Sequence, residues 1–308
     1  LWMRKLGSGS VLETKGALDE WKRAPTDLIS DTLTRPALLH ALIAEDAEVL
    51  KLMYRCFLEE GIEAKRLVHS LQPFDAFTCD WAMLLAQPRK RFKYYEELLT
   101  GEALRMRLLK QDAATIGNGP PATWPNYCLA ALGGQEKRDD LAKVHLLLAL
   151  FYAMQPGTFS FSVSDLLGLK HKERVDLLHP NTGSLYGSLS SQMNNSLSFA
   201  NQLKKMLFVR KESAIESGEL VSIPETGQRG LFIAIHRLQG SRILQLLAVN
   251  FGKTAAQQLL EMPHIRDTTA IDLMTGLAEK KSLNACTILL DLPPLSGKVI
   301  LFQPKYYD

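Results

Sequence analysis

Asp75 is a lone carboxylate at a position where it could take part in catalysis or binding. It stands in LVHSLQPFDAFT, residues 67–78, just beyond a short apolar run that is typical of a buried strand. Its short side chain can accept a backbone N–H at a helix N-cap or in a turn, which is the ordinary use of such a residue. From the pattern alone we therefore expect Asp75 to be a capping or turn residue.

Cysteine and histidine are too scattered to predict a metal site or a disulfide framework. No C-x-x-C pair occurs, and no histidine neighbours a cysteine at ligand spacing. The four cysteines are Cys56, Cys79, Cys128 and Cys286. We expect no metal, no cofactor and a reducing compartment, because a structural disulfide framework would need paired cysteines.

The basic run PRKRFKYY at 88–95 is the one stretch that offers both positive charge and aromatic rings for nucleic-acid binding. The net charge of +3 over 308 residues is nearly balanced, and the remaining Lys and Arg residues are dispersed. A charge run of this kind is more often the solvated face of a helix. With 46% hydrophobic and 22% charged residues, we expect an ordinary globular protein without a nucleic-acid partner.

Apolar runs in the sequence are short. None approaches the roughly 20 residues that span a bilayer, and no signal peptide opens the chain. We expect no membrane contact and a cytoplasmic location. The first residue is Leu1 rather than methionine, from which we expect the sequence to be a fragment of a longer product.

Strands and helices alternate through the first two hundred residues. Apolar residues at helical spacing predict a helix, or a pair of helices, from Pro36 to Glu60, ending before Gly61. A further helix is predicted over 139–154, helical sequence over 90–111 and a surface loop over 116–126. Short strands are predicted at 10–14, 27–33, 66–72 and 158–163. This rhythm indicates a parallel sheet.

The pattern changes after a predicted helix over 196–212. That helix is expected to turn six apolar residues inward: Leu197, Phe199, Leu203, Met206, Leu207 and Val209. Beyond it, short apolar runs separated by turn residues are typical of an antiparallel sandwich. We predict an α/β domain over 1–212 and an all-β sandwich domain over 213–308, with the boundary near 213–218.

Four blocks of the sequence, taken in order, resemble the α-amylase superfamily, family 13 of the glycoside hydrolases. They are DLISDTLTRPALLHALI (27–43), LVHSLQPFDAFT (67–78), LLLALFYAMQPGTFSFSVSDLLG (146–168) and LQLLAVNFG (244–252). The branch they resemble is that of trehalose synthase, a maltose α-glucosyltransferase. The resemblance implies an α/β fold, the C-terminal half of a (β/α)8 barrel with strands five to eight, followed by the sandwich.

Members of this superfamily are retaining enzymes with three carboxylates at the carboxyl ends of barrel strands. In the resemblance, Glu13 of SVLETKG matches the acid/base glutamate, and Asp75 matches the third carboxylate, which binds two sugar hydroxyls. From the sequence alone, Glu13 also fits an exposed loop residue near a frayed terminus. No residue of this chain matches the aspartate nucleophile, which belongs to the strands before the strand-five block.

Further residues are candidates for contact with substrate, among them the aromatic residues Trp124 and Tyr127. Phe74 stands where the family motif Asn-His-Asp has histidine, so a hydrogen-bond donor is replaced by a phenyl ring. Trp81 offers an aromatic face for a sugar ring, although core packing is the commoner use of tryptophan. Asp165 in SVSDLLG resembles a recurring family position, and a helix N-cap explains it equally well.

Two hypotheses follow for function. In the first, the chain belongs to a trehalose synthase-like protein that acts on maltose, trehalose or a short α-glucan, and it is inactive alone because it lacks the nucleophile. In the second, it is a truncated pseudoenzyme that serves as a carbohydrate-binding or protein-interaction module. An open half-barrel exposes strand edges, so we also expect a partner chain or self-association to complete it.

Overall fold

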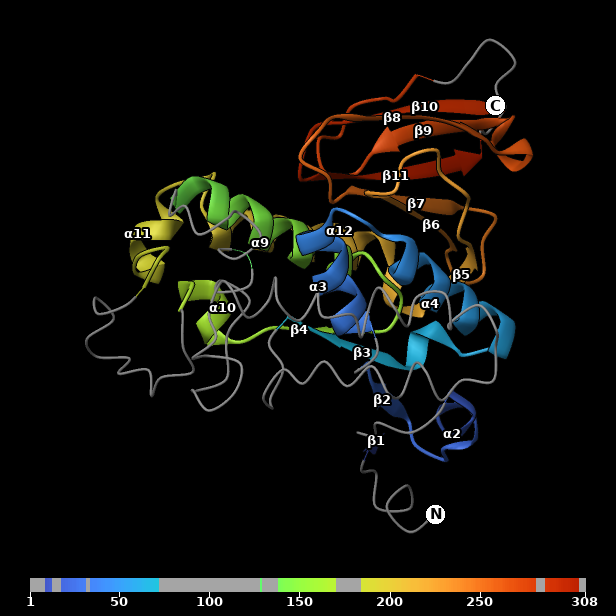
Figure 1. Ribbon diagram of the computed structural model, residues 1–308, viewed down its shortest axis with the longest axis horizontal. Coiled ribbons are helices and arrows are strands. Elements are labelled where there is room, and N and C mark those ends of the chain that lie inside the picture. Colours follow the sequence, from blue (N-terminus) through green and yellow to red (C-terminus); the bar gives the residue numbers. More distant parts are fainter. Residues whose placement is uncertain are drawn as a thin grey trace.

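A four-stranded parallel sheet forms the N-terminal part of the molecule, shown in Figure 1 as a computed structural model. The structure describes residues 9–12, 18–31, 34–71, 128, 138–169, 184–280 and 286–304. The strands lie side by side in sequence order: β1 (Val11–Leu12), β2 (Leu28–Ser30), β3 (Leu67–Ser70) and β4 (Thr158–Ser160). Each pairs in parallel with the next, which confirms the four predicted strands.

Helices fill the connections between these strands, as parallel pairing requires. They are α2 (Leu18–Arg23), α3 (Thr34–Ala44), α4 (Glu48–Glu60), the 3-10 helix η1 (Ala64–Arg66) and α9 (Arg138–Ala153). The predicted helix from Pro36 to Glu60 is therefore a pair of helices. Gly61 caps α4 with φ of 66°, a left-handed conformation that glycine adopts without steric cost.

Gly157 makes the turn from α9 into β4. Its φ is 99°, and a Cβ built on it would lie 2.3 Å from the carbonyl oxygen of Leu67. Its backbone N–H donates to the carbonyl of Glu216 at 2.9 Å. A Cβ at position 157 would clash with the backbone of Leu67. The close approach of the segments around Gly157, Leu67 and Glu216 therefore requires glycine.

Within residues 161–169 and 184–213, β4 is followed by the helices α10 (Val163–Leu167), α11 (Leu189–Met193) and α12 (Phe199–Ser213). The inward side of α12 is as predicted for Phe199, Leu203, Met206 and Val209, which are buried. The prediction for Leu197 is wrong, because Ser198 caps the helix and leaves Leu197 before it, 78% exposed. Among the helices that the structure describes, none is long and apolar enough to cross a membrane.

The C-terminal part consists of antiparallel sheets. Its elements are η2 (Ile215–Ser217), β5 (Glu219–Ser222), β6 (Leu231–Arg237), β7 (Leu244–Asn250), β8 (Ala256–Glu261), η3 (Pro263–Ile265), β9 (Thr268–Asp272), β10 (Thr287–Leu292) and β11 (Ser296–Pro304). Five strands form one sheet in the order β5-β6-β7-β11-β9, and β8 pairs with β10. Figure 1 shows the β8–β10 pair stacked on the larger sheet, as a sandwich requires.

The five-stranded sheet is buried on both faces. Ile233, Leu246 and Ile300 belong to an apolar cluster shared with β8 and β10. Phe232, Leu247 and other residues on the opposite face belong to the core formed by α3, α4, α9 and α12. A sheet covered on both sides has near-continuous apolar strands, which is why β6 and β7 do not alternate in sequence.

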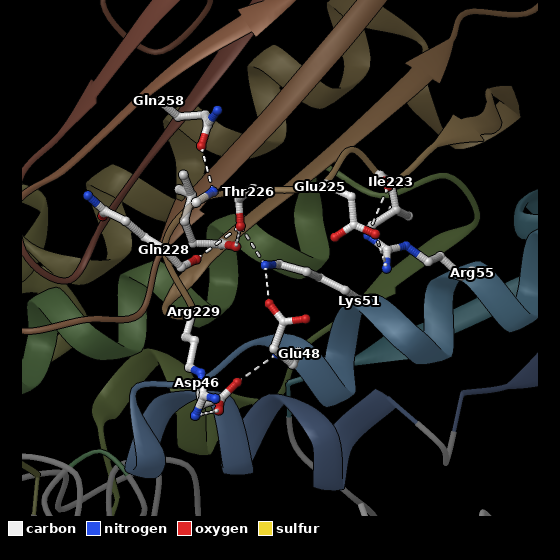
Figure 2. A network of polar contacts seen from close by, with 12 residues as sticks. Asp46, Glu48, Lys51, Arg55, Ile223, Glu225, Thr226, Gln228, Arg229 and Gln258 are labelled. Carbon is white, nitrogen blue, oxygen red and sulfur yellow. Dashed lines mark hydrogen bonds and ion pairs between the residues drawn. The ribbon is translucent and has the colours of Figure 1, made fainter. Parts of the chain in front are cut away.

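A polar network joins the two parts of the molecule (Figure 2). Lys51 of α4 is fully buried; its Nζ lies 2.6 Å from Glu48 and donates to the hydroxyl of Thr226, in the β5–β6 loop, at 2.5 Å. The Thr226 hydroxyl donates onward to carbonyls of that loop. Arg55 forms an ion pair with Glu225 at 2.8 Å. The helix and the loop are thus held together by charge and hydrogen bonds.

The predicted division into domains 1–212 and 213–308 stays a prediction. The chain does change from helix to strand at η2, within the expected boundary region. The helical sequence predicted at 90–111 and the loop at 116–126 lie outside the described residues.

Candidate functional site at the carboxyl edge of the parallel sheet

The carboxyl ends of β1 to β4 form one edge of the parallel sheet, where α/β proteins usually place their sites. Glu13 follows β1 directly in sequence, but it lies outside the described residues. The same is true of Phe74, Asp75 and Trp81, which come after β3. Their predicted roles stay predictions, and Asp165 is the one predicted site residue that the structure describes.

Asp31 follows β2 at this edge and is buried. Its carboxylate accepts the backbone N–H of Thr34 at 3.0 Å, and it also accepts the Thr34 hydroxyl. Its Oδ2 lies 2.8 Å from Nδ1 of His69, which is on β3 and equally buried. Asp31 therefore accepts from the first residue of α3 and joins the ends of two neighbouring strands.

The hydrogen bonds of His69 make both of its ring nitrogens donors. Nε2 lies 3.0 Å from the carbonyl of Pro156, which can only accept. Nδ1 faces the Asp31 carboxylate. Burial raises the pKa of Asp31, but the hydrogen bond and charge of His69, together with the bonds from Thr34, lower that pKa below its ordinary value. The pair is thus a buried ion pair.

Residues far apart in the sequence contact the turn at residues 153–157, before β4. Arg210 of α12 donates to the carbonyls of Ala153 at 2.5 Å and Gln155 at 2.8 Å, and also to that of Gly157. Carbonyls at the end of a helix lack intrahelical N–H partners, and Arg210 supplies donors to those at the end of α9. Burial lowers the pKa of Arg210, which is still charged at neutral pH.

Two polar side chains of the five-stranded sheet reach the same turn. Nε2 of His236 on β6 bonds to Oε1 of Gln155 at 3.1 Å, and Gln245 on β7 donates to the carbonyl of Met154 at 3.1 Å. Burial and then the charge of His69 lower the pKa of His236 from 6.5 to about 3, so His236 is neutral. Side chains of the α/β part and of the antiparallel part therefore bond to the same turn.

Asp165 occupies the third position of α10, so the predicted N-cap role is wrong. Ser162 is the N-cap: its hydroxyl accepts from the backbone N–H of Asp165, and Asp165 Oδ2 accepts the backbone N–H of Ser162 at 2.8 Å. This reciprocal pair is a capping box. Asp165 is fully buried here and contacts protein groups, and its contact with a sugar stays a prediction.

A second buried cluster surrounds Asp165. Its Oδ1 lies 3.4 Å from Nε2 of His145 on α9, and Nδ1 of His145 is 3.0 Å from the hydroxyl of Tyr186. His145 and Tyr186 both stack on Phe199. Burial raises the pKa of Tyr186, and the charges of Cys128 and Asp165 raise it further. Burial and then the charge of Asp165 likewise raise the pKa of the Cys128 thiol above its ordinary value.

Both clusters are buried, and the contacts of their side chains with other protein groups position the strands. The Asp31–His69 pair fixes the ends of β2 and β3, and Asp165 with His145 fixes the segment after β4. Among the described residues, no group of three or more His, Cys, Asp or Glu side chains could hold a metal ion.

Sequence reasoning missed the residues that build these clusters. Asp31, His69, His145 and Tyr186 were not among the predicted site residues. A histidine within an apolar run was the available signal, as in LVHS at 67–70 and KVHLLLALF at 143–151. Such a histidine is buried, and a buried polar group requires partners.

No family model matches the sequence. No curated protein matches it either.

Solved structures of α-amylases resemble the chain over nearly its whole length. An Anoxybacillus α-amylase, described as giving insight into a new glycosyl hydrolase subclass, has a TM-score of 0.60 at 10% identity, covering 98% of this chain and 54% of that one. The α-amylase from H. orenii has a TM-score of 0.55 at 11% identity, with 96% and 53% covered. AmyP in complex with maltose has 0.53 at 11%, with 97% and 56% covered.

These likenesses show the fold. The chain spans about half the length of each of these α-amylases and shares their arrangement of parallel strands, helices and following β-sheets over that half. At 10–11% identity they leave activity and substrate open. The half-barrel itself and the trehalose synthase branch stay predictions.

Proposed function

We propose that this chain is part of an α-glucan-active protein of the α-amylase superfamily and binds maltose or a similar α-glucoside at the carboxyl edge of its parallel sheet. The observation that carries the proposal is the likeness of fold to α-amylases over 96–98% of the chain. One similar structure, AmyP, is a complex with maltose.

Two carboxylates supply the chemistry at this edge. Glu13 follows β1 and is proposed as the acid/base, and Asp75, which follows β3 by five residues, is proposed to bind two sugar hydroxyls. A retaining mechanism also needs an attacking carboxylate, and the resemblance assigns that role to no residue of this chain. We therefore expect the chain alone to bind maltose or trehalose without turning either over.

Binding is tested by titrating maltose and trehalose into the purified chain in a calorimeter. Asp75→Asn removes a charged acceptor and is expected to weaken binding about tenfold, because charge-assisted hydrogen bonds contribute roughly 1.5–3 kcal/mol. Asp140→Asn, on the exposed side of α9, is the matched control and is expected to bind as the unchanged chain does. If neither sugar binds at millimolar concentration, the proposal fails.

A change at Phe74 is expected to strengthen maltose binding, whereas Asp75→Asn is expected to weaken it. Phe74→His restores the imidazole that the family motif has at this position, and one regained hydrogen bond to a sugar hydroxyl is expected to tighten maltose binding about fivefold. A matched Phe159→His change, on β4, adds an imidazole elsewhere in the sheet without that gain. Equal affinities for the Phe74→His variant and the unchanged chain would remove Phe74 from the site.

Turnover is tested separately by incubating the chain with maltose and measuring glucose and trehalose. Turnover that disappears in Glu13→Gln would show that the inactivity we expect is wrong, while the proposed site would stand. Absence of turnover together with measurable binding favours the second hypothesis, a carbohydrate-binding pseudoenzyme. Its specific support is the Pro73-Phe74-Asp75 sequence, which has lost the imidazole of the motif.

A further inference from the structure

A cleft of about 660 Å³ opens at one end of the β-sandwich, within the size range of ligand pockets. One wall comes from β5, β6 and the β6–β7 hairpin, and the other from the end of β8 and the start of η3. Ile235, Leu260 and Met262 form an apolar floor that continues the core between the two sheets. The cleft is therefore the open mouth of the sandwich.

Two arginines line this mouth. Arg237 is the last residue of β6, two positions beyond Ile235, so it continues the inner apolar face of that strand with a charge. Arg242 lies in the hairpin that follows. Among the described residues, neither guanidinium forms an ion pair, although Arg237 lies opposite Glu219 in the ladder. Both charges are thus available to a ligand.

The backbone around the cleft is shaped by two local features. The register of β5 against β6 shifts between Leu220 and Ser222, so Val221 is an extra residue whose side chain lines the cleft. Such bulges re-aim a side chain and are common beside functional sites. In the hairpin, the N–H of Leu238 donates to the carbonyl of Ile243 at 3.1 Å, which holds Arg242 in a short, closed loop.

The lining carries a net positive charge. Among the described residues of the lining, two guanidinium groups, those of Arg237 and Arg242, accompany one carboxylate, that of Glu261 at the end of β8. Among the described residues that line the cleft there is neither tyrosine nor tryptophan, the side chains on which a sugar would stack. Its chemistry suits an anionic head on an apolar body.

We propose that this cleft binds a small amphipathic monoanion, such as an aromatic or aliphatic sulfonate, carboxylate or phosphate ester. The anionic head pairs with Arg237 and Arg242, and the apolar body covers Ile235, Leu260 and Met262. This site is independent of the α-glucan function proposed above. Its lining residues belong to β5, β6, β7, β8, η3 and the neighbouring loops of the antiparallel part, and not to the strands of the parallel sheet.

The test uses two fluorescent dyes with the same aromatic body. One is 8-anilinonaphthalene-1-sulfonate, which carries one sulfonate, and the other is uncharged N-phenyl-1-naphthylamine. We expect the sulfonate dye to bind the full chain with one site, at least about tenfold more tightly than the uncharged dye, since two charge-assisted contacts are gained. Equal affinity for the two dyes would overturn the proposal.

Variants locate the site. The double change Arg237→Gln and Arg242→Gln is expected to weaken the sulfonate dye at least about tenfold and leave the uncharged dye unchanged. Lys204→Gln, an exposed charge on α12, is the matched control and is expected to have no effect. Val221→Trp fills the cleft and is expected to remove binding of both dyes. Unchanged sulfonate binding in the double variant or in Val221→Trp places the dye elsewhere and overturns the proposal.

Discussion

The α/β part and the antiparallel part of this molecule differ in what they bury. Around the parallel sheet, the interior contains the Asp31–His69 ion pair and the contact between Asp165 and His145. The antiparallel part has an apolar cluster between its sheets, its buried Asn250 and Asp272 bond to backbone groups, and the charges of Arg237, Arg242 and Glu261 lie at the surface.

This difference indicates that the α/β part holds its buried polar side chains in a defined geometry. Burying ionisable residues costs free energy unless every one is paired, so they contribute more to a defined geometry than to stability. An apolar core stabilises without that demand. The turn at 153–157 lies where the two kinds of interior meet, because it receives Arg210 and His69 from one part and His236 and Gln245 from the other.

Arg210→Met is expected to be the most damaging change. It removes donors from three carbonyls of the 153–157 turn, and breaking a buried charged contact costs about 3–5 kcal/mol of unfolding free energy. Urea unfolding measures the loss. Lys211→Met, at the exposed neighbouring position, is the control and should change stability by less than about 0.5 kcal/mol. A loss below about 1 kcal/mol for Arg210→Met would show that the turn does not depend on it.

Acid should destabilise the folded protein through His236. Below pH 6.5 the unfolded chain binds a proton there, whereas folded His236 has a pKa of about 3, so the free energy of unfolding falls as pH decreases across this window. At about 1.4 kcal/mol per pH unit, His236 accounts for a loss of about 2–3 kcal/mol between pH 6.5 and 4.5.

The variant His236→Gln should lose less stability than the unchanged protein over the same pH range, measured by urea unfolding at both ends. The exposed His264→Gln is the control and should keep the full acid sensitivity. Identical pH dependence in His236→Gln and the unchanged protein would contradict burial of a neutral His236.

The junction in Figure 2 should be sensitive to Thr226. Thr226→Val removes the oxygen that accepts from buried Lys51 and is expected to cost about 1–2 kcal/mol of unfolding free energy. Thermal and urea unfolding measure it. The control Thr254→Val, in the β7–β8 turn, is exposed and should be nearly neutral. If both variants behave alike, the contact between Lys51 and Thr226 does not hold the two parts together.

The smallest effect is expected at Leu197, which is 78% exposed. Leu197→Ala should change the free energy of unfolding by less than about 0.5 kcal/mol, whereas Leu203→Ala, at a buried position of α12, should cost about 2–5 kcal/mol. The two are compared by urea unfolding. A large loss at Leu197 would mean that it packs inward, as its spacing in the sequence had predicted.

Local patterns predicted the elements of the fold well. The strands around 27–33 and 66–72 and the helix over 139–154 were visible because apolar spacing and flanking breakers are properties of a few consecutive residues. Gly61 marked the end of α4 for the same reason. Leu197 was misplaced because the cap at Ser198, one residue later, decides where the helix begins.

The buried polar clusters could not be predicted in this way. His69 bonds to the carbonyl of Pro156, 87 residues away, and Arg210 bonds to that of Ala153, 57 residues away. Such pairings depend on how the elements pack, and the sequence alone does not contain that information in any short window. For Asp165, the sequence predicted that a helix begins nearby. It did not predict that Asp165 is the third residue of that helix and part of a capping box.

Hydrogen exchange with and without maltose tests most directly whether the α-glucan site lies at the carboxyl edge of the parallel sheet. We expect maltose to slow amide exchange in peptides covering residues 9–17 and 67–81, and to leave exchange in peptides covering 244–292 unchanged. Slower exchange confined to the antiparallel part, over 219–304, would contradict the account.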